Sequence, residues 1–437
     1  MNQNISDSTR KLLERRAQLL GPNVPTFYEE PVHVVRGEGV WLWDADGRKY
    51  LDCYNNVAHV GHCNARVVEA ICRQASILNT HTRYLHETIL EYVEKLTATF
   101  DASLSTAILT CTGSEANDIA LRMATAATGH TGIIATDATY HGNTTAVAEL
   151  SHNMGAIGSS SGRVRFVPAP DSYRPLGGKA GMAHAHAFAD AVAEQIALLK
   201  KSQHGFAGII LCPFFANEGF PNLPQGWLKP TVDVVRAAGG IVICDEVQPG
   251  FGRLGSHMWG HQKQDIVPDV VTLGKPMANG HPVGAVVTSS DAISAFRRNF
   301  RYFNTFGGNP VSCAAALAVL EELEEKQLME HGRRIGEYAL ERLHRLKERY
   351  DFIGDVRGSG QFFGAEMVLD RDSKTPATEF TDRVVNTMRQ QGFILSKLGR
   401  YKNTLKIRPP MPFGKEHADL LFNRLESVLA NTPLQQD

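Results

Sequence analysis

The sequence predicts an α/β fold: a mostly parallel, seven-stranded sheet covered by helices, joined to a smaller α+β domain. From about residue 105, short apolar runs alternate with helical segments, the pattern of a parallel sheet covered on both faces. Polar and small residues follow several of these runs, at the sheet edge where open α/β folds bind ligands. The length of 437 residues suits two or three domains.

The order of elements predicts that both chain ends build the smaller domain. Helices are predicted at residues 8–20, 64–78, 87–99 and 414–429. Short strands are predicted at residues 32–35, 40–44, 352–369 and 392–407. We therefore predict an N-terminal segment of the small domain at 1–63, a large domain at 64–315 and a C-terminal small domain at 316–437.

The strands of the large domain are predicted from apolar runs bounded by turn residues. These runs are Ala107–Thr110, Gly132–Thr136, Arg163–Val167, Gly208–Cys212, Gly240–Cys244, Val270–Leu273 and Ala285–Thr288. The Ser- and Gly-rich segment Gly155–Gly162 is expected to be a surface loop. A long Ala/Leu/Glu helix is expected from Ser312 onward, leading away from the sheet.

The overall composition excludes several classes of partner. The net charge of −1 gives no reason to expect nucleic acid or an anionic membrane. No apolar run is long enough to span a bilayer, and the polar start, Met1–Arg10, lacks the apolar core of a secretory signal. Seven scattered cysteines without a C-x-x-C pair fit reduced thiols in the cytoplasm. The sequence contains no pair of histidines at the spacing of a metal site, so no metal site is expected.

The first informative segment, Thr110–Asp118, passes from a strand through small residues into a helix. A helix N-terminus offers free N–H groups and a positive dipole to an anion. Gly113 lets the backbone come close to such an anion, and Ser114 adds a hydroxyl. An ordinary serine N-cap would explain the same residues.

Two further strand ends carry side chains suited to a planar ring. Tyr140 and His141 follow one strand, where an aromatic side chain can stack on a ring or simply pack. Asp245 ends another apolar run, and a buried carboxylate there needs a cationic partner. A protonated pyridine nitrogen is such a partner; a neighbouring arginine or a metal would serve as well, although no P-loop pattern accompanies the aspartate.

Lys275 follows the next strand, just before Pro276, and desolvation there would make its amine a usable nucleophile. Thr305, in the turn before the Ala-rich helix, could offer a hydroxyl to a phosphate. Each feature alone has an ordinary structural explanation. Together and in this order, they supply the phosphate grip, ring platform, carboxylate and lysine that pyridoxal phosphate requires.

These motifs resemble those of the class III (subgroup II) aminotransferases of fold type I, over about residues 25–430. The matching segments are Gly113–Asn117, Tyr140–Gly142, Asp245–Gln248, Gly274–Pro276 and Thr305–Pro310. The resemblance implies that Lys275 binds the cofactor aldehyde and later moves a proton, while Asp245 keeps the pyridine nitrogen protonated. It places Gln248 near the phenolic oxygen, Tyr140 with its neighbour His141 at the ring, and Gly113 and Ser114 at the phosphate. Thr305 comes from the neighbouring subunit in this family, which implies a homodimer or a dimer of dimers with shared active sites.

Within the class, the segments Asp52–Cys63, Leu78–His86, Gly274–Pro282 and Leu405–Met411 resemble ethanolamine-phosphate phospho-lyases most. Many class III aminotransferases pair a glutamate with an arginine to admit two substrates in turn. Here the position of the glutamate falls at Pro213, to within one or two residues, and the position of the arginine falls at Lys406. Lysine lacks the bidentate fork that suits carboxylates. The changes favour a lyase with a single anion site over an aminotransferase.

A basic stretch near the C-terminus gives a candidate site for a substrate phosphate. The candidate residues are Arg83, Arg400, Lys402, Lys406 and Arg408, with Lys397 nearby. A solvated strand face would explain the same charges. We expect β-elimination of phosphate from O-phosphoethanolamine, giving acetaldehyde, ammonia and phosphate. The alternatives are an ω-aminotransferase using pyruvate or glyoxylate and a phosphohydroxylysine phospho-lyase. A non-catalytic protein is disfavoured by the presence of both Lys275 and Asp245. A nucleotide-binding protein is disfavoured because the Gly-rich loops are missing.

Overall fold

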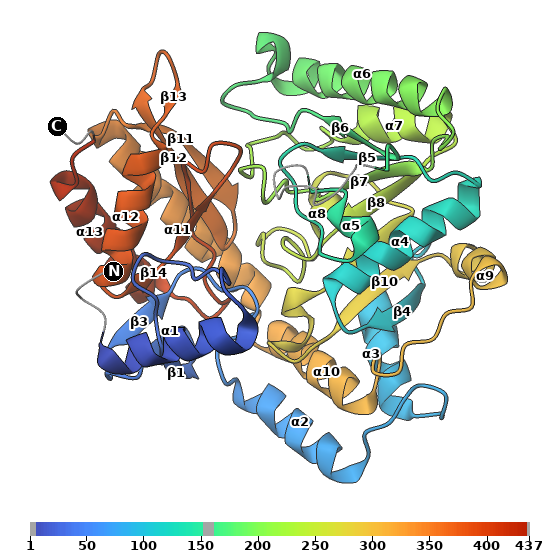
Figure 1. Cartoon of the computed structure of the whole chain (residues 1–437), viewed down its shortest axis with the longest axis horizontal. Helices are drawn as coiled ribbons and strands as arrows, with labels where there is room; N and C mark the ends of the chain where they lie inside the picture. The colour runs from blue at the N-terminus through green and yellow to red at the C-terminus, as the bar shows by residue number, and fades with distance from the viewer. Residues whose placement is uncertain (1–5, 152–160, 435–437) are drawn as a thin grey trace.

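The computed structural model describes residues 6–151 and 161–434, and its elements form two groups that lie side by side (Figure 1). The expected loop at Gly155–Gly162 lies outside the described residues except for its last two. In the larger group, a seven-stranded sheet has the order β4-β10-β9-β8-β7-β5-β6. Its strands are β4 (Thr106–Thr110), β5 (Ile133–Thr136), β6 (Val164–Val167), β7 (Gly208–Leu211), β8 (Ile241–Asp245), β9 (Val270–Leu273) and β10 (Gly284–Thr288). The predicted runs are therefore confirmed to within one residue.

Six of these strands are parallel, and β10 runs antiparallel between β4 and β9. Successive residues of a strand face opposite sides. Thus Ile133 and Ala135 of β5 pack in the core beneath one set of helices, and Ile134 packs in the core beneath another. Because both faces are covered, the strands are apolar throughout instead of alternating.

Helices cover both faces of this sheet. On one face lie α4 (Gly113–Thr128) and α9 (Ser290–Asn299). On the other face lie α2 (Ala65–Ile77), α3 (Glu87–Thr97), α6 (Gly181–Lys200), α7 (Lys229–Ala237) and α10 (Pro310–Glu325). The short elements α5 (Thr145–Ala148), η2 (Leu176–Gly178), α8 (Gly260–Lys263) and η3 (Lys275–Ala278) lie in the connections. None of the helices in the described residues is long and apolar enough to cross a membrane.

The second group of elements joins segments from the two ends of the chain. One sheet has the order β1-β2-β3-β14, in which β14 pairs in parallel with β3 through Phe393 and Leu51. Another has the order β11-β12-β16-β15, with β13 paired to β12. The strands are β1 (Val34–Glu38), β2 (Trp41–Asp44), β3 (Lys49–Asp52), β11 (Ile353–Ser359), β12 (Phe362–Asp370), β13 (Thr375–Pro376), β14 (Phe393–Ile394), β15 (Ser396–Leu398) and β16 (Thr404–Lys406). The helices are α1 (Asp7–Leu20), α11 (Leu328–Arg349), α12 (Thr378–Gln390) and α13 (Lys415–Asn431).

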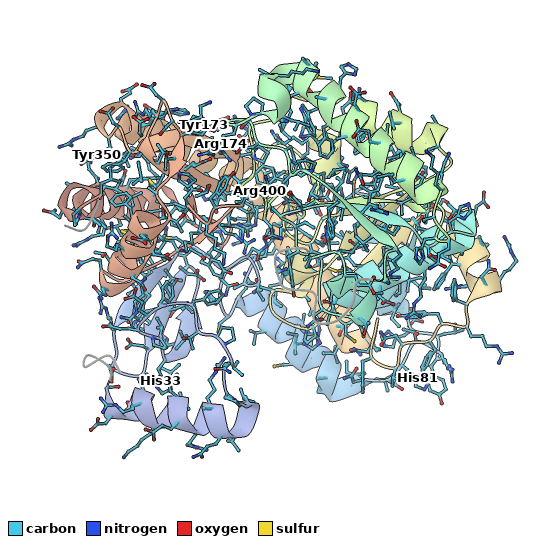
Figure 2. All side chains as sticks on the ribbon, turned by 45° about the horizontal axis from the view of Figure 1, so that its top comes forward. His33, His81, Tyr173, Arg174, Tyr350 and Arg400 are labelled. Atoms are coloured by element: carbon cyan, nitrogen blue, oxygen red, sulfur yellow. The ribbon has the colours of Figure 1, made fainter. Side chains whose placement is uncertain are left out.

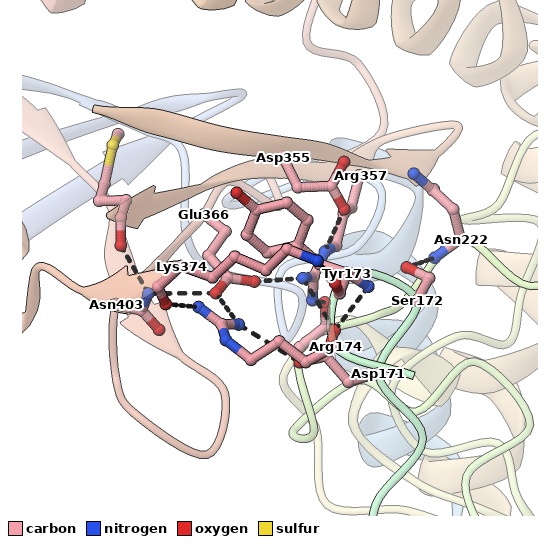
Figure 3. Close-up of polar contacts among 12 residues, drawn as sticks. Asp171, Ser172, Tyr173, Arg174, Asn222, Asp355, Arg357, Glu366, Lys374 and Asn403 are labelled. Atoms are coloured by element: carbon pink, nitrogen blue, oxygen red, sulfur yellow. Dashed lines mark hydrogen bonds and ion pairs between the residues drawn. The ribbon is translucent and has the colours of Figure 1, made fainter. Parts of the chain in front are cut away.

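A buried ion-pair network links the two groups (Figure 3). Arg357 of β11 forms ion pairs with Glu366 and Asp355 of its own group and with Asp171 of the loop that follows β6. Arg174 of the same loop pairs with Glu366 and donates to the carbonyl of Lys374. Several charge-assisted bonds share one buried carboxylate, so this network holds the strand ends of the large sheet against the smaller group.

Candidate active site

The carboxyl ends of five strands surround a cavity of about 110 Å³. Its lining residues are Gly113, Ser114, Tyr140, His141, Gly142, Cys212, Asn217, Asp245, Val247, Gln248 and Lys275. Parallel strands end at the same sheet edge, and this brings together residues that are far apart in the sequence. All the predicted cofactor-binding residues except Thr305 line this one cavity.

The beginning of α4 forms one wall of the cavity. Its capping box leaves the first turn open: Thr112 caps the amide of Glu115, and the Glu115 carboxylate accepts from Cys111 and Thr112. A Cβ at Gly113 would lie 2.9 Å from Val247, and a Cβ at Gly142 would lie 2.5 Å from Ser114 Oγ. Only glycine leaves this space open, so the helix N-terminus is free to receive an anion.

Asp245 is held at the cavity floor by three donors. Its Oδ2 accepts from His141 Nδ1 at 2.7 Å and from Asn117 Nδ2 at 3.0 Å, and its Oδ1 accepts from the amide of Val247 at 3.0 Å. Burial alone would raise the pKa of Asp245, but the hydrogen bond and charge of His141 outweigh it, so the pKa lies below its usual value. The carboxylate is therefore charged and oriented.

Lys275 begins the short helix η3 and projects into the cavity. Its side chain is exposed to the cavity, where the cavity walls limit the water around the amine. This desolvation, helped by the positive charge of Arg408, lowers the pKa of Lys275 below its usual value. The residue also has a φ of 28°, an uncommon backbone conformation that tends to occur at functional sites. The amine is thus prepared to lose its proton and act as a nucleophile.

Gln248 joins this cavity to two buried cations of the smaller group. Its Oε1 accepts from Lys406 Nζ at 3.3 Å and from Arg408 Nη1 at 2.5 Å, and its Nε2 donates to Asn217 Oδ1 at 2.9 Å. The aromatic rings of Tyr54 and Phe362 lie within cation–π distance of both cations.

Lys275, Lys406 and Arg408 form what we call the cationic cluster. Burial first, and then the charges of Arg408 and Lys275, lower the pKa of Lys406 well below its usual value. Burial also lowers the pKa of Arg408 to about 10. Within the described residues, neither Lys406 nor Arg408 forms an ion pair with a carboxylate. Buried charges without counterions are costly, so the cluster is built for an anionic ligand.

The other predicted phosphate residues lie elsewhere in this chain. Arg400 forms an ion pair with Asp137 at a different cavity, between the two groups of elements (Figure 2). Lys402 is exposed in the turn before β16. Arg83 lies 3.8 Å from the centroid of the Phe303 ring, and Thr305 is exposed on the loop that follows Phe303. Lys397 pairs with Asp382.

The structure also identifies site residues that the sequence reasoning missed. Asn117 is the last residue of the matching segment Gly113–Asn117, but the sequence predicts no role for it. In the structure its Nδ2 donates to Asp245, and its Oδ1 accepts from the hydroxyl of Thr272. Of the residues near the position predicted for Pro213, Cys212 lines the cavity, whereas Pro213 lies against Gly260. The nearness of Cys212 to the end of β7 was the available signal.

A family model described as "Aminotransferase class-III" matches residues 25–429. The chain belongs to the class III aminotransferase family. A solved phospholyase from Arthrobacter, in complex with phosphoethanolamine, is 44% identical with a TM-score of 0.93, over 97% of this chain and 100% of that chain. "Alanine–glyoxylate aminotransferase 2-like" of Drosophila melanogaster is 40% identical over 428 residues, which are 94% of this chain and 85% of the relative. "Ethanolamine-phosphate phospho-lyase homolog 1" of Caenorhabditis elegans is 34% identical, over 97% of this chain and 94% of the relative.

The class III chain is therefore an enzyme that depends on pyridoxal phosphate. The cavity fits this cofactor chemically. The start of α4 suits a phosphate, because its free N–H groups are accessible and the positions of Gly113 and Gly142 have no room for a Cβ. The charged Asp245 suits a pyridinium, and the desolvated amine of Lys275 suits an aldehyde.

Proposed function

We propose that this enzyme is a phospho-lyase that eliminates phosphate from O-phosphoethanolamine and yields acetaldehyde, ammonia and phosphate. The observation that carries the proposal is the cationic cluster, in which Lys406 and Arg408 are buried near Lys275 with no carboxylate partner among residues 6–151 and 161–434. A phosphate ester carries up to two negative charges and suits such a cluster. The complex of the Arthrobacter phospholyase with phosphoethanolamine adds support.

The neutral side chain of Cys212 supports the same substrate. Cys212 is buried at the wall of the cavity that Lys275 and Gln248 also line. Burial raises the pKa of the Cys212 thiol well above its usual value, so the thiol is neutral. With no negative charge at this wall, the cluster keeps its full attraction for a dianion.

In the proposed reaction, bound pyridoxal phosphate supplies an aldehyde for the substrate amine and a ring that withdraws electrons. Asp245 holds the pyridinium end, and His141 and Asn117 hold Asp245. Lys275 Nζ takes a proton from the carbon that bears nitrogen. The electron pair of that C–H bond forms a C=C bond as the neighbouring C–O bond breaks, and the leaving phosphate keeps the electrons of the C–O bond. Lys406 and Arg408 stabilise its charge. Water hydrolyses the released enamine to acetaldehyde and ammonia.

The proposal includes a homodimer with shared active sites. Thr305 and Arg83 are exposed on either side of Phe303, and the nearby Phe306 and Leu85 are 70% and 101% exposed. Exposed apolar side chains of this size are typical of an interface. If a second copy covers this face, Arg83 and Thr305 of one subunit would lie at the cofactor of the other subunit. The cytoplasm remains the proposed location, since all seven cysteines are free.

The deciding experiment uses the holoenzyme with O-phosphoethanolamine and no keto acid. Phosphate and acetaldehyde should both appear over many turnovers, in equal amounts, and a Lys275→Ala variant should release neither. Ethanolamine and phosphohydroxylysine serve as comparison substrates. Amino-group transfer that appears only with pyruvate or glyoxylate would contradict the proposal and make the enzyme an ω-aminotransferase.

A further inference from the structure

Two segments that resemble those of the phospho-lyases, Asp52–Cys63 and Leu405–Met411, lie against each other in the structure. The amides of Arg408 and Met411 donate to backbone carbonyls of the first segment, at 2.7 Å and 2.8 Å. The two residues between them are prolines and have no N–H to donate. The path of the backbone just after Arg408 therefore depends on what its carbonyl groups accept.

The carbonyl of Pro409 accepts from a buried arginine on the loop that follows β8. Arg253 Nη1 donates to Pro409 O at 2.6 Å and to Gln361 O at 3.2 Å. The arginine side chain is fully buried. In the part of the chain that the structure describes, it forms no ion pair with a carboxylate. A buried charge without a counterion needs its neutral acceptors in place, so each acceptor of Arg253 matters.

A third acceptor for Arg253 is a ring nitrogen of His59. Arg253 Nη2 lies 2.9 Å from His59 Nδ1, and His59 Nε2 lies 2.8 Å from the carbonyl oxygen of Phe251. A guanidinium only donates and a carbonyl only accepts, so Nδ1 has no proton and Nε2 has one. The imidazole is therefore uncharged. Burial, together with the charge of Arg253, also lowers the pKa of His59 well below its usual value, in agreement with this geometry.

The guanidinium of Arg408 has few anchors of its own. Among the described residues, its Nε has no hydrogen-bond partner, its Nη2 reaches the Tyr54 carbonyl at 3.4 Å, and its Nη1 donates to Gln248 Oε1. The direction of this guanidinium therefore depends on how firmly the backbone at residues 408–411 is held.

These contacts form a short path from an uncharged histidine to a cation of the proposed phosphate site. We propose that His59 is a positioning residue that, through Arg253, fixes Pro409 and thereby aims Arg408 at the substrate phosphate. A His59 with a proton on Nδ1 has no lone pair there for Arg253, so only the uncharged ring performs this role. The inference rests on the proposed phosphate site, whereas the proton positions on His59 do not depend on it.

The test compares His59→Leu, which has no acceptor, with His59→Asn, whose side-chain oxygen replaces Nδ1 as the acceptor. The holoenzyme is titrated with inorganic phosphate by calorimetry. The dissociation constant should rise about tenfold in His59→Leu, the size of one buried hydrogen bond to a charged group, and stay near the parent value in His59→Asn. The absorption of bound pyridoxal phosphate should stay the same in both variants, because His59 does not line the cofactor cavity. His186→Leu, at an exposed histidine of α6, is the matched control and should change neither readout.

A second measurement tests the protons on His59 in the parent protein. The ¹⁵N signal of His59 Nδ1, assigned by its loss in His59→Asn, should lie in the unprotonated range at about pH 7 and remain there at about pH 5.5. The charges that act on the ring, Arg253 and Arg408, both disfavour a further positive charge. A protonated Nδ1 under either condition would overturn the proposal, even if His59→Leu does not fold.

Arg408→Gln separates this inference from the proposed function. Weaker phosphate binding in Arg408→Gln, with parent affinity in His59→Leu, would overturn the role of His59 and leave the phosphate site standing. Equal losses in His59→Leu and His59→Asn would also overturn it, because the ring would then act by packing alone. Parent affinity in both Arg408→Gln and His59→Leu would overturn the phosphate site and the role of His59 together.

Discussion

Lys406 and Arg408, on the same segment of the smaller group, donate to one amide oxygen, Oε1 of Gln248. Two buried cations share a neutral acceptor that cannot cancel either charge. Gln248 itself lies on the loop after Asp245 and is held by Asn217. The contact therefore ties the smaller group to the cofactor side of the sheet, through a glutamine that lines the cavity.

We expect Lys406→Gln and Arg408→Gln to weaken binding of the phosphorylated substrate. Each removes one charge-assisted contact, so the KM for O-phosphoethanolamine should rise roughly tenfold to a hundredfold. Steady-state phosphate release measures this change, and inhibition by inorganic phosphate should weaken in parallel. Lys415→Gln, at an exposed lysine, is the control. Unchanged phosphate inhibition in both variants would place the substrate phosphate elsewhere.

The exchange Cys212→Glu should introduce a counterion for the cationic cluster. The new carboxylate would lie beside Lys406 and Arg408 and compete with the substrate phosphate, so the KM for O-phosphoethanolamine should rise at least about tenfold. Cys212→Gln has nearly the same shape without the charge. Equal kinetics of the two variants would show that volume, and not charge, matters at this position.

The lowered pKa of Lys275 predicts how the apoprotein regains its cofactor. A lysine with a lowered pKa becomes a free amine at lower pH than usual, so the rebinding rate should rise with pH and level off below the ordinary value of 10.5. Removing the positive neighbour in Arg408→Gln should move this rise to higher pH. Removing the negative neighbour in Asp245→Asn should move it to lower pH. The absorbance change on adding pyridoxal phosphate measures the rate, and shifts in the same direction would contradict the assignment.

The network at Arg357 predicts a large effect on stability far from the cofactor. Arg357→Leu leaves Glu366 and Asp171 without their shared cation, and such a loss in a buried network costs about 3 to 5 kcal/mol. The free energy of unfolding in urea should fall by this order. Arg345→Ala removes an exposed pair with Glu341 and should change little. Equal effects of the two variants would mean that the network contributes no more than a surface pair.

The sequence by itself determined that the cofactor-binding residues follow successive strands of the large sheet. Apolar runs followed by Gly113, His141, Asp245 and Lys275 can only meet at one edge of a parallel sheet, and the structure brings them to one cavity. Lys406 and Arg408 were also among the predicted phosphate residues. Periodicity and strand ends are local properties, so a single sequence displays them directly.

Only the tertiary structure decided which basic residues share the site. Lys402 and Arg408 lie close in sequence, yet the first is exposed and the second is buried beside Gln248. Arg400 instead forms an ion pair with Asp137. Cys212 lines the cavity, whereas the next residue, Pro213, does not. Burial and charge pairing depend on contacts between segments more than a hundred residues apart. The spacing of residues along the chain carries no record of those contacts.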